Sequence, residues 1–124
     1  MQNAELDACD MVNVIEDKSF RFAVRIVKLC KHLRTQKQEI VLSKQILRSG
    51  TSIGANVAEA QRAQSKPDFI AKLNIALKEA SETNYWIRLL RASDYLTEEE
   101  ATSVLGDCIE IEKILVSILN TAKK

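Results

Sequence analysis

The sequence predicts an all-α protein, an antiparallel up-down-up-down bundle of four helices, and three observations carry this prediction. The chain of 124 residues holds only 3 glycines and 1 proline, too few for the turns of a many-stranded sheet. Its hydrophobic residues, 46% of the total, recur every three or four positions in four separate segments. Four amphipathic helices joined by short links bury their apolar faces most simply against one another.

The first predicted helix covers residues 17–35, and residues 1–16 are expected to form a flexible N-terminal arm ahead of a bundle of residues 17–124. One face of this helix collects five apolar residues, namely Phe22, Ile26, Leu29, Cys30 and Leu33. Another face carries what we call the basic stripe, which consists of Lys18, Arg21, Arg25, Lys28 and His32. The spacing of these cations covers about 15 Å of helix, comparable with several phosphate steps of a nucleic acid.

The second predicted helix covers residues 37–64, because apolar spacing continues through Gly50 and Gly54 where a phosphate-binding loop would interrupt it. A glycine inside a helix costs about 1 kcal/mol relative to alanine, so close packing of another helix is expected to compensate. We expect Asn56 to form a hydrogen bond across such a contact. Residues assigned to helix packing or subunit contact in this segment are Arg48, Gly50, Ser52, Gly54, Asn56 and Glu59.

The third predicted helix covers residues 66–92 and starts at Ser65, followed by Pro67 and Asp68 in the first turn. Its main apolar stripe consists of Phe69, Leu73, Ala76, Leu77, Ala80 and Ile87. A second apolar group is expected on the other side of the helix: Ile75, Trp86, Leu89 and Leu90. One interpretation is a wide bundle core that takes up both groups. The favoured interpretation is a subunit contact through Ile75, Trp86 and Leu90.

The fourth predicted helix covers residues 98–122. Thr97 is its expected N-cap, and Glu100, three residues later, completes a capping box. Three consecutive glutamates in the first turn suit the positive end of the helix dipole.

The residues with chemical reactivity do not assemble into a catalytic set. His32 is the only histidine and belongs to the basic stripe, so neither a Ser-His-Asp nor a Cys-His arrangement is built around it. Cys30 and Cys108 fall on apolar faces, and the carboxylates of the last two helices lack the histidines of a di-iron site. We therefore expect a protein that is not an enzyme and holds no metal and no cofactor.

An odd number of cysteines without a paired motif indicates reduced thiols, and no apolar run is long enough to span a membrane. A cytoplasmic location is expected.

The net charge of +1 conceals a dipolar molecule. Residues 18–48 hold nine basic residues and one acid, Glu39, whereas residues 79–112 hold nine acids and two bases. The leading hypothesis is nucleic-acid binding by the basic stripe. Two alternatives remain: the stripe is an ordinary solvated face, or it pairs with acidic helices of a neighbouring subunit in a protein-interaction scaffold.

The segment from Leu42 to Leu90 resembles the four-helix-bundle family of proteins related to those encoded by intervening sequences of 23S ribosomal RNA genes. The residues that carry the resemblance are Arg48, Ser52, Ile53, Ala55, Asn56, Val57, Ala58 and Glu59, followed by the stretch from Asp68 to Trp86. Gly54 stands where many members have proline.

The resemblance implies a homo-oligomer, usually a ring of five subunits. The family is also similar to the accessory variability protein of diversity-generating retroelements, a basic pentamer that binds nucleic acid and a reverse transcriptase. The partners it implies here are other copies of the chain, RNA in preference to DNA, and a nucleic-acid-processing protein.

Overall fold

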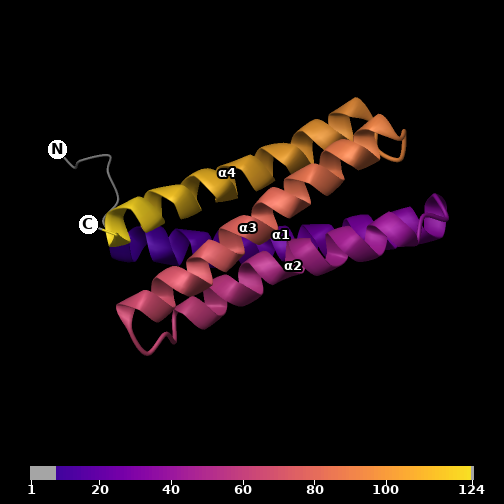
Figure 1. Cartoon of the computed structure of the whole chain (residues 1–124). Helices are drawn as coiled ribbons and strands as arrows, with labels where there is room; N and C mark the ends of the chain where they lie inside the picture. Colours follow the sequence, from indigo (N-terminus) through magenta and orange to yellow (C-terminus); the bar gives the residue numbers. More distant parts are fainter. Residues whose placement is uncertain (1–7, 124) are drawn as a thin grey trace.

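The computed structural model describes residues 8–123, which form four α-helices and no strand. These are α1 (Ala8–Gln36), α2 (Val41–Ala60), α3 (Lys66–Ala92) and α4 (Glu98–Ala122). Figure 1 shows two helical hairpins, α1 with α2 and α3 with α4, packed against each other. The prediction of an all-α, four-helix protein is confirmed.

Contacts between neighbouring helices give their relative directions. A Cβ added at Gly50 would lie against Ile26, and one at Gly54 against Ser19, so α1 and α2 are antiparallel. Ser49 contacts Thr83 and Glu59 contacts Lys72, which makes α2 and α3 antiparallel. Lys18 contacts Glu110 and Met11 contacts Ser117, so α1 and α4 are antiparallel as well.

The first helix begins at Ala8, nine residues before the predicted start at Asp17, so the expected flexible arm is wrong for residues 8–16. Met11, Val12 and Ile15 extend the apolar face, and Ile15 is completely buried in the core. The remainder of the expected arm, residues 1–7, lies outside the described residues.

The second helix is shorter than the predicted 37–64 at both ends. Its start is fixed by Glu39, whose buried carboxylate accepts hydrogen bonds from the backbone N–H groups of Val41, Leu42 and Ser43 at 3.2, 3.0 and 2.7 Å. Gln38, immediately before it, has a φ of 52°, which ends the preceding helix. The predicted bounds of α3 and α4 agree with the structure.

The predicted caps are present at both later helices. The Ser65 hydroxyl accepts a hydrogen bond from the Asp68 backbone N–H at 3.2 Å. Thr97 and Glu100 form the full capping box, which lowers the pKa of the Glu100 carboxyl because it accepts the Thr97 backbone N–H.

The buried face of α3 contains four residues of the predicted apolar stripe, together with Thr83 and Leu90. It consists of Leu73, Ala76, Ala80, Thr83, Ile87 and Leu90. Leu90, predicted to project outward with Ile75 and Trp86, is completely buried, whereas Ile75 is 42% exposed. Leu90 therefore packs inside its own subunit.

Cys30 and Cys108 lie in the core. Burial raises the pKa of the Cys30 thiol to about 11 and that of Cys108 to about 12. Each thiol lies 3.3 Å from a backbone carbonyl oxygen, that of Ser43 for Cys30 and that of Ala80 for Cys108. They behave as small core residues.

Candidate functional site

The basic stripe of α1 divides into two parts in the structure. Three of its members turn toward α4. Lys18 pairs with Glu110 at 3.2 Å, and Arg25 pairs with Asp107 at 2.6 Å while also donating to the Ser103 hydroxyl at 2.6 Å. His32 is half-buried and lies near Glu100 of α4, where, after the Thr97 backbone hydrogen bond, it is among the groups that lower the pKa of that carboxyl. The acidic face of α4 thus neutralises this side of the stripe within one chain.

A groove of about 330 Å³ lies between the two helices at this point. Its charged lining mixes three cations with two acids, namely Lys18, Arg21, Arg25, Asp107 and Glu110. A phosphate in this groove would meet carboxylates as well as cations, so the groove is a poor site for a nucleic-acid backbone.

The other two members of the stripe, Arg21 and Lys28, are exposed. Arg21 pairs with Asp17 of its own helix at 3.1 Å, a solvent-exposed contact of small energetic weight. Lys28 forms no ion pair within residues 8–123, and it belongs to a larger group of exposed cations around the α1–α2 connection. We call this group the basic end; it consists of Lys28, Lys31, Arg34, Lys37 and Lys44.

No acid of the α1–α2 connection offsets the basic end. Glu39, the one acid in this part of the sequence, is turned inward as the cap of α2. No lysine or arginine of the basic end makes an ion pair with a described residue. Lys37 does lie near enough to Glu100 of α4 to contribute, after the Thr97 backbone hydrogen bond, to lowering the pKa of that carboxyl. Among the positive groups of α1 and α2, these are the ones most available to a phosphate backbone.

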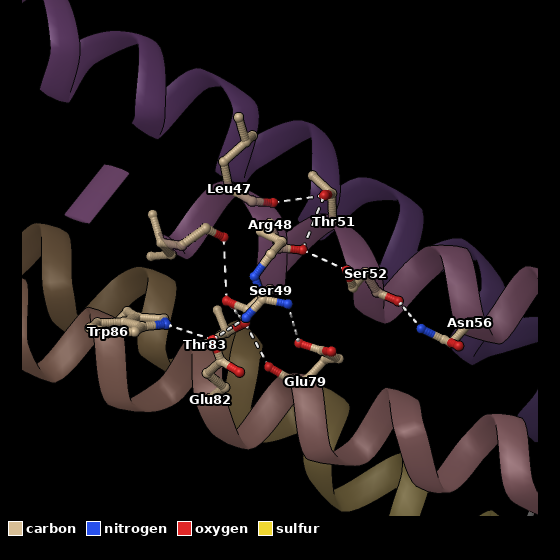
Figure 2. A network of polar contacts seen from close by, with 11 residues as sticks. Leu47, Arg48, Ser49, Thr51, Ser52, Asn56, Glu79, Glu82, Thr83 and Trp86 are labelled. Atoms are coloured by element: carbon tan, nitrogen blue, oxygen red, sulfur yellow. Dashed lines mark hydrogen bonds and ion pairs between the residues drawn. The ribbon is translucent and has the colours of Figure 1, made fainter. Parts of the chain in front are cut away.

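A second polar constellation joins α2 to α3 (Figure 2). Arg48 lies between two carboxylates of α3, with a close ion pair to Glu82 and a longer one to Glu79 at 3.6 Å. The indole N–H of Trp86 donates to the same Glu82 carboxylate at 3.0 Å. Beneath them, the Thr83 hydroxyl contacts the Ser49 hydroxyl at 2.9 Å in the core.

This network perturbs the ionisation of its charged members. The hydrogen bond from Trp86, and after it the contact with Arg48, hold the pKa of Glu82 below its ordinary value of 4.5. The hydrogen bond to Glu82 raises the pKa of Arg48, which stays charged in any case. With one arginine shared by two carboxylates, the network clamps two helices together.

Stability should depend on pH through Glu82. Because its folded-state pKa is lowered, the ionised carboxylate stabilises the fold at neutral pH, and this contribution is lost as the pH falls below 4.5 through the lowered value. We expect Glu82→Gln to show a shallower loss of unfolding free energy than the wild type between pH 7 and pH 3. Urea unfolding followed by circular dichroism measures this, and parallel curves for the two proteins would contradict it.

Three more of the residues assigned to helix packing follow Arg48 along α2. Ser52 donates its hydroxyl to the Arg48 carbonyl at 2.6 Å, and Asn56 donates to the Ser52 carbonyl at 2.8 Å. Asn56 thus bonds within its own helix, and the predicted hydrogen bond across a helix contact is wrong for its amide N–H. Glu59 reaches α3 and pairs with Lys72 at 3.2 Å.

The two glycines of α2 lie against α1. A Cβ at Gly50 would come within 2.9 Å of the Ile26 side chain, and one at Gly54 within 3.2 Å of the Ser19 backbone oxygen. The third glycine, Gly106 on α4, has open space around it. The absence of a side chain at Gly50 and Gly54 is what allows α1 and α2 to approach so closely.

Trp86 is half-buried, packs against the core and stacks edge-on against Tyr85 with ring centroids 5.2 Å apart. Ile75 and Tyr85 are the exposed apolar groups of α3, at 42% and 49%.

An exposed apolar row on α1 was not recognised from the sequence. Phe20, Val24 and Val27 are 68%, 41% and 51% exposed. Their spacing of four and three residues, on a face turned away from the core residues, is the signal that identifies them.

Within the described residues no group of three His, Cys, Asp or Glu side chains could hold a metal ion. Among the helices that the structure describes, none is long and apolar enough to cross a membrane.

Comparison with known proteins places the chain in a family. A family model described as 23S rRNA-intervening sequence protein matches residues 12–117. A solved structure, of a protein with unknown function from the S23 ribosomal protein family of Bacteroides thetaiotaomicron VPI-5482, is 58% identical with a TM-score of 0.88. The match covers 89% of this chain and 98% of that one, while no curated protein matches. The chain belongs to the 23S rRNA-intervening sequence protein family.

Proposed function

We propose that this chain is a non-enzymatic, homo-oligomeric nucleic-acid-binding protein of the cytoplasm, with RNA favoured, and that it holds the phosphate backbone at the basic end. The observation that carries the proposal is the set of five exposed cations without ion-pair partners among residues 8–123. Lysine and arginine groups in this state bind phosphates by releasing counterions, which gives affinity without sequence preference. The proposal moves the predicted site along α1, away from Lys18 and Arg25, which α4 neutralises.

Assembly would strengthen such binding. Each subunit contributes only a few cations, and several copies in one particle present them together, so avidity raises the affinity without any new contact. The family description, which refers to 23S rRNA, makes RNA the first probe to use. The pentamer implied by the family resemblance remains part of the proposal.

The test is a titration of fluorescent RNA at two salt concentrations, with a DNA duplex in a parallel arm. The variant Lys28→Glu/Arg34→Glu/Lys37→Glu reverses three charges of the basic end. The matched control Arg62→Glu/Lys66→Glu/Lys78→Glu reverses three exposed charges elsewhere and changes the net charge equally. We expect the wild type and the control to bind alike.

In the basic-end variant we expect the slope of log affinity against log salt to fall by about 2 to 3, because three phosphate contacts are lost. Equal loss in both variants would show that net charge alone drives binding, and would contradict a site at the basic end. No binding at low salt by the intact oligomer would reject the nucleic-acid function.

A protein-interaction scaffold is the second candidate function. The observation that favours it is the exposed row of Phe20, Val24 and Val27, since apolar side chains gathered on a surface mark protein contacts. It is supported if RNA fails to bind at low salt while the protein stays assembled.

A further inference from the structure

The exposed row on α1 is part of a longer stripe with charges of opposite sign at its two ends. Glu16, Phe20, Val24, Val27 and Lys31 follow at spacings of four, four, three and four, so they share one face of the helix, and all five are exposed. The acid lies toward the start of α1 and the base toward its end. We call this set the α1 stripe.

A matching stripe runs along α4. It consists of Glu98, Thr102, Ile109, Lys113 and Val116, which share one face and are all exposed. Ile109 and Val116 are 37% and 43% exposed. As in the α1 stripe, the acid precedes the base along the chain. We call this set the α4 stripe.

The contacts between α1 and α4 show which residues of the two stripes lie at the same height of the bundle. Lys18 reaches Glu110, so Glu16 and Phe20, on either side of it, lie near the heights of Lys113 and Ile109 in these antiparallel helices. Arg25 reaches Ser103, and the same step along both helices brings Lys31 near the height of Glu98. An acid therefore lies at the same height of the bundle as a base at two positions, Glu16 with Lys113 and Lys31 with Glu98. The apolar side chains of Phe20 and Ile109 lie at the same height between these two positions.

We propose that a second copy of this chain packs its α4 stripe on the α1 stripe of the first, with the two bundles parallel and level. A rotation about an axis parallel to the bundle axis produces this contact and keeps every residue at the same height along the bundle. Lys31 therefore meets Glu98 of the neighbouring copy, and Glu16 meets its Lys113. The facing helices run in opposite directions, which also sets their dipoles favourably.

This contact joins two different surfaces, so repeating it closes a ring or extends a filament. It rests on the homo-oligomer of the proposed function and supplies the faces that build it. Lys31 then belongs to the interface, and Lys28, Arg34, Lys37 and Lys44 of the basic end stay exposed for a phosphate backbone. An α1-to-α1 contact about a twofold axis would also pair Glu16 with Lys31, but it would leave Ile109 and Val116 exposed. The head-to-tail contact places Phe20 of one copy beside Ile109 of the other.

Charge exchange tests the proposal through particle mass, measured by light scattering over a dilution series without RNA. Lys31→Glu and Glu98→Lys should each shift dissociation to protein concentrations at least about tenfold higher, because like charges then face each other across the interface. The double variant should restore assembly. Lys78→Glu, which alters an exposed cation outside both stripes, should leave the mass unchanged.

Rescue of Lys31→Glu by Glu16→Lys instead of Glu98→Lys would overturn the proposal in favour of the twofold contact. Unchanged assembly in both single variants would overturn it as well. Circular dichroism of each variant separates loss of assembly from loss of fold.

Cross-linking gives a second, independent measurement. A mixture of Phe20→Cys and Ile109→Cys chains should form a disulfide-linked pair under mild oxidation, while each variant alone, like the wild type with its own thiols, should not. A linked pair from Phe20→Cys alone would overturn the head-to-tail contact. Neither measurement contains nucleic acid, so failure here and failure of RNA binding are distinguishable.

Discussion

Replacing Leu90 with alanine lowers the free energy of unfolding by about 2 to 5 kcal/mol, because the truncation removes apolar contacts and leaves a cavity in the core. Leu90 is completely buried among the residues of the bundle core. Urea unfolding followed by circular dichroism at pH 7 and one protein concentration measures the change.

The matched control is Ile75→Ala on the same helix. Ile75 is 42% exposed, and its truncation should change the unfolding free energy by no more than about 0.5 kcal/mol. The sequence pattern grouped these two residues on one outward face, whereas the structure separates them. Equal effects of the two substitutions would contradict the orientation of α3.

On α3 the apolar spacing predicted the buried face correctly at Leu73, Ala76, Ala80 and Ile87, and a polar residue inside that face is the reason that Leu90 was misassigned. Thr83 lies in the core between Ala80 and Ile87, where a threonine in the sequence suggests a solvent-facing position. Its hydroxyl is satisfied by the Glu79 carbonyl at 2.8 Å and by Ser49 of α2, so burial leaves it with hydrogen-bond partners. The buried face continues through Ile87 to Leu90, and the pattern assigned Leu90 to the wrong side.

The start of α1 was missed for a related reason. Ser19 is buried between Ile15 and Phe22, so a polar residue interrupts the apolar spacing on this side of α1. Ser19 lies under Gly54, where the two helices are close, so a small residue is required on α1 as well as on α2. Apolar spacing predicted the four helices. Because hydroxyl residues are buried on α1 and α3, the same spacing did not predict every residue that faces inward.

Pairing across helices was beyond the reach of the sequence pattern. Lys18 and Glu110 are 92 positions apart, and only the packing of α1 against α4 brings them to 3.2 Å. The sequence therefore predicted which positions form the basic stripe, and the fold determines which of these cations stay available to a phosphate backbone. Glu39 illustrates the same limit, since its role as a cap depends on the chain turning back at Gln38.

Replacing Gly50 with valine lowers the free energy of unfolding by about 1 to 3 kcal/mol, the usual cost of adding volume to a packed core. Ile26 meets the first added carbon at 2.9 Å through both branches of its side chain. Because a β-branched side chain has few alternative rotamers, Ile26 cannot turn away, and the two helices must separate.

Gly106→Val makes the same chemical change on α4, where nothing lies within 4 Å of the added carbon. Only helix propensity then changes, and we expect the free energy of unfolding to rise by a few tenths of a kcal/mol. The opposite signs of the two changes in unfolding free energy distinguish the effect of packing from that of helix propensity. If Gly50 served only backbone flexibility, both substitutions would change the unfolding free energy in the same direction. A Gly50→Val protein as stable as the wild type would show that α1 and α2 do not need their close approach, and the role assigned to Gly50 would be wrong.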